Sequence, residues 1–520
     1  MLSKVFGAGL TGTDGFLVSC EADVENGFPQ ITFIGSLSSS ARESADRVRT
    51  AVSNSGISLE PRRVTINLSP ADLRKDGCGY DLPIAVSLLR AYRLLPDRLL
   101  SGSLFIGELS LGGEVLPVNG VNSMVSAAAA AGLKRCFLPV ENLREGSVIS
   151  GISCYGIHTL LDLLDYLTGR MPLPAPAVYL DKIAEDPAAG PDFSEICGQD
   201  SAVRAALLAA GGRHNLLLIG PAGTGKSMIA ERMPGILPQM TRGERLELSR
   251  IYSIAGLLDP EEPLMRHRPF RAPHQMATPQ SLTGGGKRPR PGEISLAAHG
   301  VLFLDELPEF RTESLESLRQ PLEERKVSIS RVSGNFTFPA NFQLVCAMNP
   351  CRCGFWPDRS RCRCSEQQVR SYLSRISKPL LDRIDIAAET SVLPYDSLRL
   401  KAEGRSSSAF REQVEKVRAI QEKRFRSLGI RFNSEMRAEE VKQFCRISPE
   451  DEQFLKEIYE RCSMSARVLH KILKVARTAA DFAGRAEIRH EDLCEAISYR
   501  TPEEKFFGAS KIRRPAYGKS

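Results

Sequence analysis

Short apolar runs that end in glycine or polar residues are the most regular pattern in the middle of the chain. Asn215–Ile219 (NLLLI), Val301–Leu304 (VLFL) and Phe342–Met348 (FQLVCAM) contain few polar positions, which predicts buried strands of a parallel sheet. Further along, apolar and basic residues recur at helical spacing in Phe410–Phe425 and Ala466–Ala483. The pattern therefore predicts an α/β core followed by a helical C-terminal segment.

The segments around this core differ from it in composition. The N-terminal part mixes strand-like stretches such as Arg62–Pro70 with helix-like ones such as Val121–Ala131. Five prolines within Met171–Pro191 fix φ and remove hydrogen-bond donors, so this stretch is expected to be a linker. These features divide the chain into a domain at 1–169, a linker at 170–191, a core at 192–395, a helical segment at 409–503 and a basic tail at 504–520.

The composition of the 520 residues is that of a globular protein. Apolar residues make up 42% and charged residues 25%, which excludes a disordered, collagenous or disulfide-scaffold chain. The net charge of +7 permits a nucleic-acid partner without requiring one. No apolar run approaches the roughly 18 residues of a membrane helix, and no compact apolar stretch precedes Asp14. We therefore expect a cytoplasmic protein without a membrane partner.

A glycine-rich loop follows the first core strand and runs into a helix-like stretch. Its sequence, GPAGTGKS, has the strand–loop–helix context of a phosphate-binding loop. Backbone N–H groups of such a loop converge on phosphate oxygens, the lysine reaches the β- and γ-phosphates of ATP, and the serine ligates Mg²⁺. The predicted nucleotide-binding residues are Gly220, Pro221, Ala222, Gly223, Thr224, Gly225, Lys226 and Ser227.

Polar residues also follow the other two core strands. Asp305 and Glu306 end the second strand, where the first can hold Mg²⁺ and the second can polarise the attacking water. Asn349 ends the third and can hydrogen-bond the γ-phosphate or the water. An asparagine that merely caps the turn before Pro350 has the same sequence pattern, so spacing alone leaves both readings open.

The middle segment resembles AAA+ ATPases, and most closely the magnesium-chelatase-like ATPases of the YifB/ComM family. The resemblance implies an α/β AAA+ core with a helical lid, and it extends into both flanking segments. The stretches that carry it are GPAGTGKS, Arg268–Gly286, Arg290–Phe310, Leu318–Arg331, Met348–Gly354 and Ser377–Ile386.

The same resemblance implies roles for three further groups. Asn349 would be sensor 1, and Arg467 would be sensor 2 on the lid. Arg383 would be an arginine finger that reaches the γ-phosphate of a neighbouring subunit, where a guanidinium neutralises charge on the transferring phosphoryl group. A finger acting between subunits requires a ring, so a hexamer is expected. Arg375 is a nearby competitor for this role, and a surface salt bridge is the alternative for each arginine.

Four cysteines crowd into an insertion at 351–364, whereas the other nine of the 13 are scattered, as suits a reducing cytosol. Cys351, Cys353, Cys362 and Cys364 form the pattern CxC-x8-CxC, which suits one tetrahedral Zn²⁺. Such a site would be structural, because four thiolates leave no open coordination position. Disulfides are the alternative, which a cytosolic location disfavours.

Two stretches of the N-terminal domain, Arg74–Leu89 and Gly107–Asn142, resemble the proteolytic domain of Lon proteases. This implies a Lon-like α+β fold, whose activity needs a serine in a KDGxS-type loop and a later lysine. Gly79 stands where the serine would be, and Val121–Met124, where the lysine would fall, contains none. We therefore expect no peptidase activity, and we expect the adjacent Cys78 to be a buried cysteine.

Two basic segments are candidates for contact with DNA phosphates. One is GGGKRPRPGE, and the other, Lys326–Phe338, alternates like a β-hairpin around Gly334 and Asn335. A solvated charged surface is the plain alternative. The candidate cations are Lys287, Arg288, Arg290, Lys326 and Arg331.

Three functions are compatible with these motifs. The YifB/ComM resemblance favours a hexameric ATP-driven DNA motor of helicase or branch-migration type, acting on single-stranded or branched DNA in homologous recombination or natural transformation. The second is a chelatase-like ATPase that remodels a protein partner in metal insertion. The third, a binding module with ATP as an assembly switch, is disfavoured because Glu306, Asn349 and Arg383 are all present.

Overall fold

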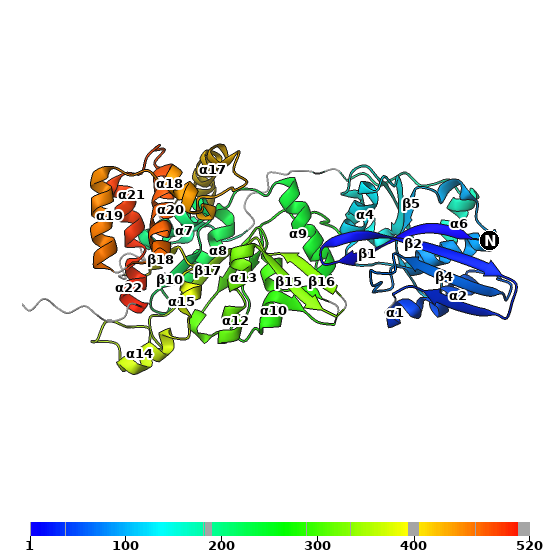
Figure 1. Ribbon diagram of the computed structural model, residues 1–520, viewed down its shortest axis with the longest axis horizontal. Coiled ribbons are helices and arrows are strands. Elements are labelled where there is room, and N and C mark those ends of the chain that lie inside the picture. The colour runs from blue at the N-terminus through cyan, green and yellow to red at the C-terminus, as the bar shows by residue number, and fades with distance from the viewer. Residues whose placement is uncertain are drawn as a thin grey trace, which may run out of the picture.

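The computed structural model describes residues 2–36, 38–179, 181, 190–287, 289–332, 334–393, 405–462 and 464–507. The molecule is elongated (Figure 1). An N-terminal unit lies at one end, a second sheet with its helices lies in the middle, and the C-terminal helices lie at the other end.

The N-terminal unit is built on a seven-stranded mixed sheet of order β3-β4-β2-β1-β5-β8-β9. Antiparallel pairs join β1 to β2 and β2 to β4, and the remaining neighbours are parallel. Alternate residues of β2 and β4 are buried, which gives each strand one face toward the core. The seven strands of this sheet are β1 (Ser3–Thr11), β2 (Asp14–Glu25), β3 (Gln30–Ile34), β4 (Arg63–Ser69), β5 (Ser103–Phe105), β8 (Arg135–Pro139) and β9 (Ser153–Ile157), and β6 (Glu108–Leu109) and β7 (Val115–Leu116) pair separately. The helices of the N-terminal unit are α1 (Ser39–Arg42), α2 (Ser44–Asn54), α3 (Asp81–Ala91), α4 (Val121–Ala130), α5 (Leu143–Ser147) and α6 (Leu160–Thr168).

The central sheet has five parallel strands in the order β11-β14-β17-β10-β18. Every residue of β10, β14 and β17 is buried, which confirms the three buried strands predicted from the apolar runs. The strands are β10 (Leu216–Ile219), β11 (Phe270–Arg271), β14 (Val301–Leu304), β17 (Gln343–Met348) and β18 (Ile386–Glu389). The helices and short strands around them are α7 (Asp200–Gly212), α8 (Lys226–Ile236), α9 (Arg242–Ala255), α10 (Pro279–Thr283), β12 (Gly284–Gly285), β13 (Arg290–Pro291), α11 (Glu293–Leu296), α12 (Thr312–Glu316), α13 (Arg319–Glu324), α14 (Glu366–Leu373) and α15 (Lys378–Leu381).

The predicted β-hairpin is present as β15 (Lys326–Arg331) and β16 (Gly334–Pro339), but its turn lies two residues earlier than expected. Arg331 pairs with Gly334, so Gly334 and Asn335 belong to the second strand rather than to the turn. This register buries Val327 on β15 directly opposite Phe338 on β16. Burial of these side chains, rather than the turn preference of Gly-Asn, therefore sets the register.

The C-terminal segment consists of helices, as its spacing predicted. The buried face of α20 contributes Val475, Ala476 and Ala479 to a core shared with α7 and α17. Serine N-caps at Ser406, Ser448 and Ser465 start three of the helices. The helices are α17 (Ser407–Phe425), α18 (Ala438–Phe444), α19 (Pro449–Arg461), α20 (Ala466–Phe482), α21 (His490–Ser498) and α22 (Thr501–Phe507).

Part of the expected linker, 180 and 182–189, and most of the expected tail, 508–520, lie outside the described residues. Asp181 of the linker pairs with Arg245 of α9 at 3.0 Å. The N-terminal unit contacts the central unit mainly where α4 meets α9 (Figure 1).

Candidate nucleotide site

The phosphate loop joins β10 to α8, and two of its glycines are required by backbone conformation. Gly223 and Gly225 have φ of 74° and 83°, in the left-handed region that L side chains rarely adopt. Gly220 is required for space, because a Cβ there would lie 2.2 Å from Thr390 Oγ1. The loop thus has the strand–loop–helix geometry that the sequence predicted.

Lys226 links the phosphate loop to the end of β17. Its ammonium group donates to the carbonyl oxygens of Gly220 (2.8 Å) and Pro221 (2.7 Å), and to Asn349 Oδ1 (3.1 Å). Burial lowers the pKa of Lys226, while the charges of Asp305 and Glu306 oppose that shift. The structure therefore brings Asn349 to the lysine that would hold the γ-phosphate.

The end of β14 lies beside the same loop. Ser227 Oγ donates to Asp305 Oδ2 at 2.9 Å, so the two predicted Mg²⁺ ligands already touch. A hydroxyl and a carboxylate in contact at this position fit the donor set of a hard oxygen-seeking cation. Glu306 is exposed and has φ of 51°, an uncommon conformation for a residue with a side chain.

One residue of the site was missed from the sequence. Thr390 follows β18, and its hydroxyl lies 2.7 Å from that of Thr224 in the phosphate loop. The available signal was a polar residue directly after β18, similar to the signal that identified Asp305 and Asn349.

The three arginines do not join the phosphate loop by any described contact within one chain. Arg383 lies after α15 and pairs with Glu323 of α13 and with the carbonyl of Pro379. Arg375 pairs with Glu309 at 2.8 Å. Arg467 is exposed on the first turn of α20.

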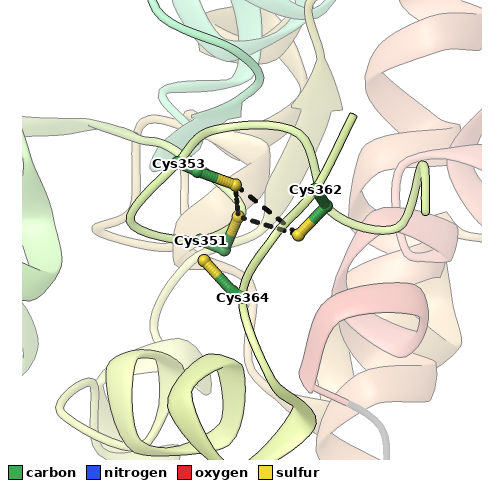
Figure 2. Close-up of side chains that lie close together, drawn as sticks. All are labelled: Cys351, Cys353, Cys362 and Cys364. Carbon is green, nitrogen blue, oxygen red and sulfur yellow. Dashed lines mark hydrogen bonds between the residues drawn. The ribbon is translucent and has the colours of Figure 1, made fainter. Parts of the chain in front are cut away.

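The four predicted cysteines converge on one point (Figure 2), with their Sγ atoms all within 4.8 Å of one another. Cys353 lies 3.4 Å from Cys351 and 3.5 Å from Cys362, well beyond the ~2.05 Å of a disulfide. Four Zn–S bonds of 2.3 Å at tetrahedral angles separate sulfurs by about 3.8 Å, close to these distances. The donor set and spacing therefore fit zinc.

The cysteine loop also touches the phosphate loop. A Cβ on Gly354 would lie 3.7 Å from the backbone of both Pro221 and Ala222. Within the cysteine loop, Arg359 stacks over Trp356 at 4.1 Å and Arg361 over Phe355 at 4.0 Å. The cysteine loop thus lies beside one wall of the candidate nucleotide site.

The thiols of this loop differ in acidity. Burial alone would raise the pKa of Cys353, but backbone N–H donors and the neighbouring thiols lower it to about 6. Burial raises the pKa of Cys362 to about 12. A bound dication would require thiolates at all four positions, so metal binding would release the remaining protons.

The candidate DNA-contacting cations lie on two neighbouring hairpins. Lys287, Arg290, Lys326 and Arg331 are all exposed, whereas Arg288 lies outside the described residues. The β12–β13 hairpin approaches the tip of β15, because a Cβ on Gly285 would lie 3.5 Å from Arg331 Nη2. The structure thus gathers cations from separate sequence segments.

Lys75 and Cys78 lie in the loop of the N-terminal unit that resembles the KDGxS-type loop of Lon proteases. Lys75 is buried and donates to the carbonyl of Pro70, and burial lowers the pKa of Lys75. Cys78 is half-buried, so the expectation of a buried cysteine was wrong. The reason is that it sits in a loop ahead of α3 rather than within the helix, whose residues are almost all buried.

A phosphate loop on a five-stranded parallel sheet, with Asp305 and Asn349 at adjacent strand ends, defines a P-loop nucleotide-binding protein. Sequence similarity to known families narrows this class of protein further. Residues 192–398 match the family described as "Magnesium chelatase, subunit ChlI", residues 20–142 match "Subunit ChlI of Mg-chelatase", and residues 404–500 match "Magnesium chelatase, subunit ChlI C-terminal". The chain belongs to the YifB/ComM family of magnesium-chelatase-like AAA+ proteins, which confirms the resemblance.

The relatives cover nearly the whole chain. "Competence protein ComM" of Haemophilus influenzae is 40% identical over 504 residues, 96% of this chain and 97% of that protein. "Uncharacterized protein YifB" of Escherichia coli is 37% identical over 514 residues, 98% and 99% of the two chains. A Lon protease of Syntrophomonas wolfei is 32% identical over 146 residues, 27% of this chain and 18% of that one. Among the described residues, no helix is both long and apolar enough to cross a membrane.

Proposed function

We propose that this protein is an ATP-hydrolysing motor that forms a hexameric ring and moves on DNA. The observation that carries the ATPase part is the pair of contacts that join Lys226 to Asn349 and Ser227 to Asp305. Magnesium and ATP would be held by these four residues and by the loop amides, and together they supply the polarised γ-phosphate. These four residues would thus bind the nucleotide and its magnesium ion within one subunit.

Each remaining polar group has a role in this proposal. Glu306, exposed at the end of β14, would take a proton from the attacking water. Arg383 would reach the phosphate of the adjacent subunit, exchanging Glu323 for the nucleotide. The C-terminal helices would form the lid, with Arg467 as sensor 2 on α20.

The DNA part rests on the cations of the two hairpins and on the relatives. Exposed Lys287, Arg290, Lys326 and Arg331 can contact phosphates irrespective of sequence. The similarity to a protein named for competence directs the proposal to homologous recombination or natural transformation, with single-stranded or branched DNA as the partner in the cytoplasm. Arg288 is included as a sequence-based candidate only.

The cysteine loop is proposed to hold one structural Zn²⁺ through Cys351, Cys353, Cys362 and Cys364. The N-terminal unit is proposed to be a Lon-like fold without peptidase activity, since Gly79 carries no nucleophile and no lysine lies within Val121–Met124.

A second function keeps the ATPase but changes its target. The family descriptions name magnesium chelatase, so the chain can instead be an ATPase that remodels a metal-inserting protein partner. That protein would hydrolyse ATP without responding to DNA.

One assay separates the two functions. ATP turnover is measured with and without forked or single-stranded DNA at fixed, stated salt, because phosphate contacts weaken steeply as salt rises. The motor predicts strong stimulation that falls with salt, together with strand separation of the fork. Unchanged turnover would reject the motor and favour the chelatase-like function.

Two variants control this assay. Glu306→Gln should cut ATP turnover by about 100-fold or more, so any turnover that it retains reveals a contaminating ATPase. Glu313→Gln, which changes an exposed acid on α12, is the matched control and should keep native turnover.

A further inference from the structure

A polar pocket lies at the edge of the central sheet opposite the phosphate loop. Gly300 and Gln343, which line it, stand at the amino ends of β14 and β17, whereas the phosphate loop follows the carboxyl end of β10. These three strands are parallel, so the pocket and the nucleotide site are on opposite edges. Other central-unit residues, among them Arg213 and Arg268, line it too, and Arg418 of α17 with Arg431 and Phe432 beyond that helix complete the lining.

The lining of this pocket is strongly basic. Among the described residues, four arginines (Arg213, Arg268, Arg418 and Arg431) and one acid, Glu244, line it. Arg213 and Arg268 have side chains that are only 8% and 9% exposed. Positive charge is therefore held partly out of water, where guanidinium groups need counter-charges that two nearby carboxylates supply, by the described ion pairs, only to Arg213 and Arg268.

Arg418 shows the imbalance most clearly. Its Nε and Nη2 both donate to the carbonyl oxygen of Ala210, at 3.2 and 2.8 Å, and its guanidinium lies 4.9 Å from the ring of Phe432. Arg213 lies 5.1 Å from the same ring. A carbonyl and a ring satisfy hydrogen-bonding and stacking geometry, but neither cancels a full charge.

The acids nearby are shared among several cations. Glu244 is 3.1 Å from Arg268 and 3.7 Å from His299, and Glu435 is 3.4 Å from Arg213. Burial and the charge of Arg325 lower the pKa of Arg213 to about 9. Because arginine keeps its proton in proteins, this cost is relieved by an anion rather than by deprotonation.

We propose that this pocket binds a phosphate group, held between guanidinium groups of the central unit and of the C-terminal helices. Planar guanidinium forks match the oxygens of a tetrahedral oxyanion. Arg213 and Arg268 belong to the central unit and Arg418 and Arg431 to the C-terminal segment, so the bound group ties the two together. The site is separate from the ATP site and does not depend on the proposed motor function.

The first experiment uses inorganic phosphate and the full-length chain carrying Lys226→Ala, which weakens phosphate binding at the ATP loop. Thermal melting is compared in phosphate and in chloride at equal ionic strength. We expect melting about 3 °C higher in phosphate. Arg431→Gln, at the exposed rim, should weaken phosphate binding by about tenfold, while Arg426→Gln, an exposed arginine just beyond α17 and outside the pocket, should not.

A second arm identifies the source of the phosphate group. Binding of a short single-stranded oligonucleotide is measured for the same two variants at fixed salt. If Arg431→Gln binds the oligonucleotide more weakly and Arg426→Gln does not, and if free phosphate leaves the melting temperature unchanged, the pocket is assigned to a backbone phosphate of nucleic acid. Only this second experiment rests on the proposed DNA role. The proposal is overturned if phosphate produces no shift and the two variants bind the oligonucleotide equally.

Discussion

At the scale of single residues, the nucleotide site is held together by contacts that ATP must exchange. Lys226 is bonded to Asn349 and to two loop carbonyls, and Ser227 is bonded to Asp305. Burial lowers the pKa of Lys226 because it removes water from the ammonium group, and the negative charge of a bound triphosphate would favour the charged form again. The polar ends of β14 and β17 were predictable because buried runs reveal where parallel strands stop.

Arg383, the proposed arginine finger, gives the sharpest prediction at this scale. Arg383→Ala should leave ATP binding within about threefold of the native value and reduce hydrolysis by about 1,000-fold, because the guanidinium acts on the transition state. Nucleotide binding and phosphate release measure the two effects. Arg375→Ala, whose side chain pairs with Glu309, is the control and should retain most activity.

Action between subunits is tested by mixing two inactive variants. Arg383→Ala keeps Lys226, and Lys226→Ala keeps Arg383, so a mixed ring contains some sites with both groups intact. We expect the mixture to regain measurable hydrolysis. A mixture as inactive as its components would assign the finger to its own chain and remove the argument for a ring.

At the scale of elements, spacing predicted which segments are helices and strands, while packing decided their registers. The β15–β16 hairpin was predicted, but its turn was misplaced because the Gly-Asn pair was weighted above the buried Val327 and Phe338. The cysteine cluster was predicted from spacing alone. Its contact with the phosphate loop through Gly354 was not, since no local pattern encodes it.

Metal removal tests the cysteine loop. The purified protein should contain about one zinc ion per chain, and Cys362→Ser should lose most of it. Because this loop lies against Pro221 and Ala222, loss of zinc should also weaken ATP binding by about tenfold. Elemental analysis and nucleotide titration measure both, with the exposed Cys494→Ser as control. A native protein free of zinc would contradict the assignment.

Helix α20 carries a pH-dependent element. Lys471 is buried and donates to the carbonyl of Ile384 at 2.8 Å, and burial lowers its pKa from 10.5 to about 8. Between about pH 8 and 10.5 the unfolded chain therefore binds a proton that the folded chain does not. The free energy of unfolding should rise with pH in that window, by an amount on the order of 2 kcal/mol.

Chemical denaturation at pH 8, 9 and 10 checks this rise. Lys471→Met should flatten the pH dependence because it removes the titrating group. Lys416→Met, an exposed lysine on α17, should keep the native slope. Identical slopes for all three proteins would show that Lys471 does not carry the effect.

At the scale of the whole molecule, the sequence indicated the three main parts but not how they meet. Phe193, far from the C-terminal helices in sequence, packs edge-on against Phe410 of α17. The basic pocket likewise draws arginines from positions 213 to 431. Such contacts depend on the path of the chain in space, which periodicity along it does not contain.

One buried serine bonds to two groups across the junction between the N-terminal and central units. Ser253 Oγ of α9 accepts from the backbone N–H of Gly120 at 2.8 Å and donates to Glu145 at 2.5 Å. Burial raises the pKa of Glu145, so its ionised form depends on such donors. Ser253→Ala leaves the N–H and the carboxylate each one partner short, which should cost about 1–2 kcal/mol locally.

Hydrogen exchange in the full-length protein measures this loss. Amides at the start of α4 should exchange about tenfold faster in Ser253→Ala, because opening of the junction becomes about 1.4 kcal/mol easier. Ser126→Ala, which removes only a contact with Arg250, is the matched control and should change exchange less than about twofold. Equal acceleration in β4, which lies in the N-terminal sheet away from α9, would instead indicate general destabilisation and would contradict a local junction. Faster exchange confined to α4 and α9 would show that the two units part at this serine while each keeps its own core.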